Sequence, residues 1–213
     1  MARPTRRARR QSGFTLVELL LGIVLAAIFA IALYGFFSNG LTQAATHRNQ
    51  AVAQSEGRRA MDVMTRELRQ AVSPDGGATP PIITLTPTSI VFHLDASRVP
   101  GNAAPRPQRI RYQITGGSLT REFADPIGSA PPYTYSTYRP PETIVADVRN
   151  GATPLFRAFT PEGTALAATI AAPVTADAAQ VSVRLIVGYR TGNANSTLEL
   201  TTDVAPRNPR RAL

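Results

Sequence analysis

The chain of 213 residues contains no cysteine, and this absence excludes several kinds of chemistry. No disulfide can tie the fold together, and neither a thiolate nucleophile nor a thiolate metal site is possible. Lysine is absent as well, so all 23 basic side chains are arginines, against 14 acids. Because an arginine-only choice can reflect the base composition of a genome, we do not infer nucleic-acid binding from it.

Proline is absent from residues 5–73, although the whole chain contains 18 prolines. Seventeen of these lie at or beyond Pro74, and proline is the strongest breaker of helices. The distribution predicts one helix from Phe14 to about Val72, which ends at the turn sequence that begins at Ser73.

The second half of this helix, residues 38–73, has an amphipathic pattern. Met61, Met64 and Leu68 recur at helical spacing, while arginines and acids occupy the other faces. We interpret these apolar residues as a stripe that faces a folded head, and not as a ligand site. Gly35, Gly40 and Gly57 are predicted to be soft points of the helix.

Ionisable side chains are almost absent from residues 14–37, where Glu18 is the single exception in 24 residues. A helix of that length reaches about 36 Å, enough to cross a bilayer core of about 30 Å. Five arginines and no acid precede it, so the positive-inside rule predicts a cytoplasmic N-terminus and an exported C-terminal part. Without those five arginines, 18 basic side chains face 14 acids, a net charge of +4.

Glu18 needs an explanation, because an acid inside a membrane helix costs about 2.5 to 3.5 kcal/mol on insertion scales. Such a residue is a candidate functional site by default. The alternative is that Glu18, one turn from the cytoplasmic end, reaches back to headgroups, water or Arg10.

The sequence from Gly13 to Glu18, GFTLVE, resembles the processing motif of type IV pilin-like proteins. The resemblance implies an α+β pilin fold, in which a long N-terminal helix packs on a mainly antiparallel sheet. It implies that a prepilin peptidase cuts after Gly13, removes residues 1–13 and methylates the new amine of Phe14. It also implies that Glu18 pairs with the terminal amine, usually that of a neighbouring subunit, during filament assembly. Glycine suits the cut, since it has no side chain to block approach to its carbonyl.

Residues 74–213 are predicted to form an extracytoplasmic, β-rich head. Residues 125–141 are expected to form a long surface excursion. We expect a four- to six-stranded, mainly antiparallel sheet against the amphipathic half of the helix. The predicted strands are Ile82–Thr86, Ser89–Asp95, Leu155–Thr160 and two hairpins, Arg109–Thr115 with Ser118–Phe123 and Gln180–Tyr189 with Ser196–Val204.

The order of these segments also resembles W-type minor pilins and the J-type minor pseudopilins of type II secretion. The resemblance includes the terminal Val-x-x-Arg-Asn from Val204 to Asn208. Many major pilins close a C-terminal loop with a disulfide, so the absence of cysteine favours a minor subunit.

Catalytic patterns are missing: we find no glycine-rich phosphate loop, no G-x-S-x-G elbow and no paired metal-ligand spacing. His47 and His93 are expected to be exposed or satisfied histidines. Calcium, which related major pseudopilins bind, would need a loop spacing that the aspartates do not show.

Two groups of basic and aromatic residues are candidates for contact with DNA. Each has the alternative of a solvated strand face, or of a tyrosine-rich loop that packs on its own sheet. The groups are Arg106, Arg109 and Arg111 near Tyr112, and Arg139 with Tyr133, Tyr135 and Tyr138.

The sequence therefore predicts a structural subunit without enzymatic activity or cofactor. It would be a single-pass protein of the cytoplasmic membrane that later joins a periplasmic or extracellular filament. The resemblance implies as partners a prepilin peptidase, other pilin-like subunits and an inner-membrane assembly platform. Pilus, type II secretion and competence systems remain alternatives, as do a DNA-uptake pilin and a signal-anchored envelope enzyme.

Overall fold

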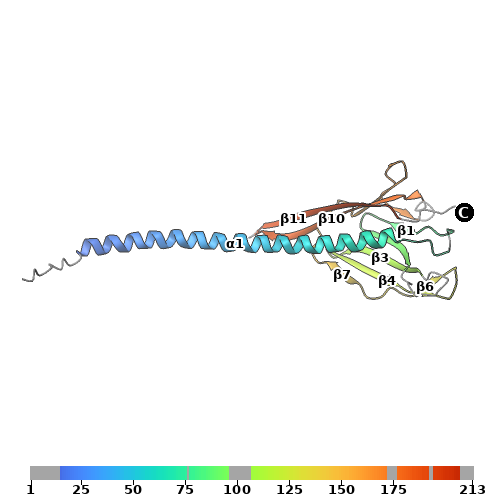
Figure 1. Cartoon of the computed structure of the whole chain (residues 1–213), viewed down its shortest axis with the longest axis horizontal. Coiled ribbons are helices and arrows are strands. Elements are labelled where there is room, and N and C mark those ends of the chain that lie inside the picture. The colour runs from blue at the N-terminus through green and yellow to red at the C-terminus, as the bar shows by residue number, and fades with distance from the viewer. Residues whose placement is uncertain (1–14, 76, 96–106, 172–176, 192–193, 207–213) are drawn as a thin grey trace, which may run out of the picture. The chain divides into compact units, whose positions relative to one another are not determined.

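The structure is a computed structural model that describes residues 15–75, 77–95, 107–171, 177–191 and 194–206. The long helix α1 (Leu16–Arg69) precedes all the strands in the chain (Figure 1). Contacts divide the chain into two compact units, Met1–Ala45 and Thr46–Leu213, and α1 contributes residues to both. The strands are β1 (Ile82–Leu85), β2 (Ser89–Asp95), β3 (Pro107–Thr115), β4 (Ser118–Ala124), β5 (Pro126–Ile127), β6 (Thr134–Tyr135), β7 (Glu142–Val145), β8 (Phe156–Phe159), β9 (Ile170–Ala171), β10 (Gln180–Thr191) and β11 (Ala194–Val204).

Helix α1 runs without a break for 54 residues, as the absence of proline predicts. Its predicted first residue, Phe14, lies outside the described residues. The helix ends at Arg69, before the predicted end near Val72. The reason is tertiary: Ala71 forms a β-bridge with Leu94, and the N–H of Val72 donates to the carbonyl oxygen of His93 at 2.9 Å. Pairing with β2 therefore replaces the last predicted helical residues.

The second part of α1 buries one face in the head. The predicted stripe is confirmed, since Met64 and Leu68 are fully buried and Met61 is nearly so. Gly57, one of the predicted soft points, lies buried within the continuous helix. A Cβ atom there would overlap the Leu200 side chain, so glycine permits close packing of helix and sheet.

The described strands form sheets in which every strand pair is antiparallel, as predicted. One of these sheets has six strands, within the expected four to six, but the division of the strands among further sheets was not expected. Among the described residues, the sheets are six-stranded (β7-β4-β3-β2-β1-β9), three-stranded (β11-β10-β8) and two-stranded (β5-β6).

The head portion of α1 contacts both larger sheets. On the six-stranded sheet, Glu67 accepts a hydrogen bond from Tyr112 of β3. On the three-stranded sheet, Gly57 packs against Leu200 of β11. Apolar residues from both sheets, such as Phe92 and Leu185, belong to the same core cluster as Met64. Burial is therefore shared between two sheets around one helix, which no strand pattern in the sequence indicates.

Both predicted hairpins are confirmed. β3 and β4 meet at Gly116 and Gly117, whose φ angles of 59° and 79° lie in the left-handed region, as a primed turn requires. β10 and β11 pair continuously from Val181–Val204 to Thr191–Ala194. The turn residues 192–193 of this second hairpin lie outside the described residues.

Candidate functional site

The predicted processing site lies at the start of α1. Gly13 and Phe14, the predicted cleavage and methylation residues, lie outside the described residues. Thr15 precedes the helix, and the backbone N–H of Glu18 donates to the Thr15 hydroxyl (3.3 Å) and carbonyl oxygen (3.1 Å). Thr15 is therefore the N-cap of α1.

Glu18 is an exposed acid in the first helical turn. A negatively charged side chain at this position interacts favourably with the positive end of the helix dipole. Among the described residues its side chain has no hydrogen-bond or ion-pair partner. Sequence reasoning missed the local role of Glu18 at the helix start. The spacing Thr-x-x-Glu, from Thr15 to Glu18, is the signature of a capping box and could have indicated it.

The apolar part of α1 is uncovered. Its large side chains are 45% exposed or more, and Leu33 is the least exposed of them. Among the described residues, α1 is the one helix that is long and apolar enough to cross a membrane. Burying such a surface requires lipid or other protein chains, because leaving it in water forfeits about 25 cal/mol for each Å². The apolar residues are Leu16, Val17, Leu19, Leu20, Leu21, Ile23, Val24, Leu25, Ile28, Phe29, Ile31, Leu33, Tyr34, Phe36, Phe37 and Leu41.

The same segment matches a known protein family. The model for the prokaryotic N-terminal methylation motif covers residues 8–34. The match includes Gly13, Phe14 and Glu18, together with most of the apolar run. With the α+β fold described above, it supports a type IV pilin-like protein.

This motif has consequences for processing and location. It implies processing by a prepilin peptidase and assembly with other pilin subunits, and proteins that carry it are structural subunits. The motif and the apolar helix together fit a single-pass protein that is anchored in a membrane.

The head holds a buried network that fixes α1 to the six-stranded sheet. Glu67 accepts hydrogen bonds from the Tyr112 hydroxyl (2.6 Å) and from Arg121 Nη2 (2.9 Å) and Nε (3.1 Å). The side chains of Arg121 and Glu67 are 17% and 12% exposed. Burial beside this carboxylate raises the pKa of Tyr112, so the phenol stays protonated. This network holds the head on the helix.

The two candidate groups for DNA contact pack within the head, in agreement with the alternative of a tyrosine-rich loop that packs on its own sheet. Arg109 lies over the ring of Tyr135 (4.2 Å from Cζ to the centroid), and Arg111 lies over Tyr138 (4.1 Å). Tyr112 is fully buried on the opposite face of β3, and Arg106 lies outside the described residues. These arginines and tyrosines contact one another within the head, which leaves them less available for DNA.

The predicted excursion, residues 125–141, covers the outer face of the six-stranded sheet. It contains the short strands β5 and β6, which were not among the predicted strands. Asp125 fastens it, since this carboxylate pairs with Arg139 (2.6 Å) and accepts a hydrogen bond from Gln108 Nε2 (2.7 Å). The excursion places Tyr135 over the sheet.

His93 was expected to be exposed or satisfied, and this prediction is wrong. The side chain is 2% exposed, and neither ring nitrogen has a hydrogen-bond partner. Its ring stacks on Tyr135 with 5.2 Å between centroids, beside its cross-strand neighbour Arg109. Burial, with the positive charge of Arg109, lowers the pKa of His93 from 6.5 to about 4. His47, by contrast, is exposed as expected.

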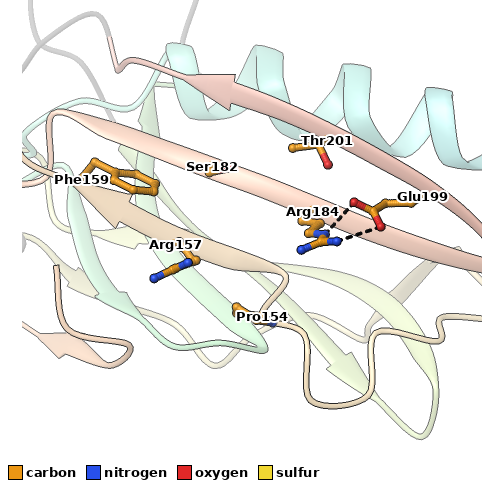
Figure 2. Close-up of a pocket in the computed structure, with 7 residues that line it drawn as sticks. All are labelled: Pro154, Arg157, Phe159, Ser182, Arg184, Glu199 and Thr201. Atoms are coloured by element: carbon orange, nitrogen blue, oxygen red, sulfur yellow. Dashed lines mark hydrogen bonds and ion pairs between the residues drawn. The ribbon is translucent and has the colours of Figure 1, made fainter. Parts of the chain in front are cut away.

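A groove of about 380 Å³ lies on the outer face of the three-stranded sheet, and Figure 2 shows the residues that line it. Arg184 and Glu199 form a bidentate ion pair in this groove. Arg184 Nε donates to Glu199 Oε1 at 2.6 Å, and Arg184 Nη2 donates to Glu199 Oε2 at 2.9 Å. The lining residues are Pro154, Arg157, Phe159, Ser182, Arg184, Glu199 and Thr201. They provide no nucleophile with an adjacent base. In the described part of the chain, no three His, Cys, Asp or Glu side chains are grouped to hold a metal ion.

Proposed function

We propose that this protein is a minor pilin or pseudopilin. A prepilin peptidase cuts after Gly13, methylates the amine of Phe14 and removes the leader, residues 1–13. The remaining chain spans the cytoplasmic membrane once with residues 14–37, with its N-terminus in the cytoplasm. It then joins a filament through this helix. The observation that carries the proposal is the methylation motif at residues 8–34 on a helix whose apolar surface is uncovered.

The proposed domain arrangement follows from this function. Residues 38–73 form the amphipathic half, of which the helical part ends at Arg69, and residues 74–213 form the head outside the cytoplasm. The W-type or J-type resemblance and the absence of cysteine support a minor subunit near the filament tip. A pilus, a type II secretion pseudopilus and a competence filament all fit these features.

In the proposed assembly step, Glu18 pairs with the methylated amine of Phe14 of a neighbouring subunit. The exposed Glu18 side chain, without a partner in the described residues, supports this role. A carboxylate in a membrane needs such a charge, because insertion of an unpaired acid costs about 2.5 kcal/mol or more.

Mass spectrometry of the chain extracted from membranes tests the processing step. The expected N-terminus is Phe14 with one added methyl group, in cells that contain the peptidase. Gly13→Val should keep the leader, whereas the matched Gly13→Ala should be cut more readily, because a branched side chain hinders approach to the scissile carbonyl. An intact Met1 terminus in the wild-type chain would contradict the proposal.

Glu18→Ala tests the assembly step. This variant should still insert and should still be cut by the peptidase in vitro at an unchanged site, yet it should enter filaments poorly. Glu18→Asp keeps the charge and should restore part of the incorporation. Normal incorporation of Glu18→Ala into sheared filaments would exclude the pairing with Phe14.

A further inference from the structure

The long strand β11 has an open edge. It pairs with β10 along its whole length, from Ala194 to Val204, and it is the end strand of its sheet. No other described strand pairs with it. The opposite edge of the same sheet is covered, since the N–H of Leu166 donates to the carbonyl oxygen of Ala158 in β8 at 2.9 Å. Proteins usually cover or shorten such edges, because unpaired strand groups recruit other strands.

Hydrogen bonds of β10 show which groups of β11 face outward. The N–H groups of Arg184 and Gly188 donate to carbonyl oxygens outside the hairpin, at 2.8 Å each. In an antiparallel pair of strands, two residues that lie opposite each other either exchange backbone hydrogen bonds, or both point their N–H and C=O groups away from the partner strand. Thr201 and Thr197 lie opposite these two residues, so their N–H and C=O groups point away from β10. They have no backbone partner in the described part of the chain.

A groove of about 350 Å³ lies beside this edge. One wall is β11 and the other is a stripe of α1, so a chain in the groove would meet strand backbone and helix side chains together. The lining residues are Leu200, Thr201 and Thr202 of β11, with Arg58, Met61, Asp62, Thr65 and Arg69 of α1.

The helix wall carries a net positive charge. Arg58 and Arg69 are exposed, and neither has an ion pair or a side-chain hydrogen bond among the described residues. Asp62 is the single acid on this wall. Arg58 and Arg69 are eleven positions apart, which corresponds to about 16 Å along the helix. Carboxylates at positions i and i+4 of a strand lie on one face, about 13 Å apart, and the long arginine side chains can cover the remaining difference.

We propose that the open edge of β11 binds an extended segment of another protein that carries carboxylates at positions i and i+4. The segment adds a strand by pairing with the outward groups of Thr197 and Thr201, and its carboxylates reach Arg58 and Arg69. The outer face of β11 carries Glu199 and Asp203, so acids on the other face of the segment are disfavoured. This docking site does not depend on the function proposed above.

Binding of a synthetic peptide to the full-length protein in detergent micelles tests the site. The probe is fluorescent Thr-Glu-Thr-Val-Thr-Glu-Thr, followed by anisotropy. We expect binding that weakens as salt rises, and at least tenfold weaker binding when both glutamates are replaced by lysine. Arg58→Gln with Arg69→Gln should reduce the preference for glutamate over lysine.

Proline at position 201 tests the backbone pairing. Thr201→Pro removes an outward N–H that β10 does not use, so the hairpin should stay intact while binding falls at least tenfold. Thr201→Val is the matched control and should bind like the wild type. A peptide with N-methyl groups on alternate backbone nitrogens should also lose binding, which tests the pairing without altering the protein.

Three outcomes would overturn the proposal. The first is equal binding of the glutamate and lysine peptides, and the second is full binding of the N-methylated peptide. The third is self-association of the wild-type protein that Thr201→Pro abolishes, which would make a second copy of this chain the occupant.

Discussion

The two parts of α1 have the same backbone geometry and opposite surroundings. In residues 16–45, large apolar side chains such as Leu16 and Phe36 are about three-quarters exposed. In residues 46–69, Met64 and Leu68 are fully buried in the head. The difference lies in the side-chain pattern: an apolar surface on all sides needs a partner outside the chain, whereas a single stripe is satisfied by the chain's own sheets.

Each part of α1 also carries one notable glutamate. Glu67 holds Tyr112 and Arg121 and is largely buried, so it stabilises the head. Glu18 has no side-chain partner in the described residues, and in the proposed assembly step its partner comes from another chain. Variants in the two parts should therefore change different properties.

The largest loss of stability is expected for Glu67→Leu. This change leaves Arg121 buried without its partner, and breaking a buried pair in this way costs about 3 to 5 kcal/mol. Urea unfolding in detergent micelles, followed by tyrosine fluorescence, measures the loss. Glu18→Leu is the matched control and should leave the head as stable as the wild type. Equal losses in both variants would contradict the comparison.

Acid should weaken the head through His93. Because the pKa of His93 is about 4 when folded and 6.5 normally, the unfolded chain binds the proton first. The contribution of His93 to the free energy of unfolding is therefore at its maximum above pH 6.5. It falls by up to about 3 kcal/mol as the pH drops toward 4. In His93→Phe, the free energy of unfolding should change much less between pH 6.5 and pH 4. Asp75, whose pKa is lowered to about 2, contributes a separate loss below about pH 4.

Replacing a glycine by a larger residue should change the stability of the head in one part of the helix and not in the other. Gly57→Leu forces a side chain against Leu200 and Val187, and overpacking of this kind costs about 1 to 3 kcal/mol. At Gly40 an added Cβ meets nothing within 4 Å, so Gly40→Leu should not weaken the head. Thermal unfolding of both variants, followed by circular dichroism, provides the measurement.

The smallest effect is expected at the surface ion pair. Arg184 and Glu199 have side chains that are 49% and 45% exposed, so water screens their attraction. Arg184→Ala should unfold at the same urea concentration as the wild type, at low and at high salt. A clear loss at low salt would show that this pair supports the three-stranded sheet.

Much of the fold could be predicted because the signals are local. Proline placement predicts the long helix, and the Gly116-Gly117 pair predicts the turn between β3 and β4. The division into two sheets could not be predicted, because alternation along β8 or β10 shows that a strand has two faces but not which strand it joins.

The candidate site shows the same limit. Glu18 is visible as one acid in an apolar run, whereas the burial of His93 depends on Tyr135, which lies 42 residues later in the chain. The tyrosine-rich composition of residues 125–141 is typical of a surface that binds nucleic acid. The contacts of these tyrosines with Arg109 and Arg111, however, result from folding of that segment onto the sheet.

The direct passage from α1 into the six-stranded sheet has a mechanical consequence. Ala71 and Val72 pair with β2 immediately after the helix, and Glu67 in the last helical turn is bonded to Tyr112 and Arg121. Tension along the helix therefore reaches the head through several bonds at once, with no flexible linker to stretch first. The head should respond to pulling as a stiff attachment, in which these contacts share the force and fail together.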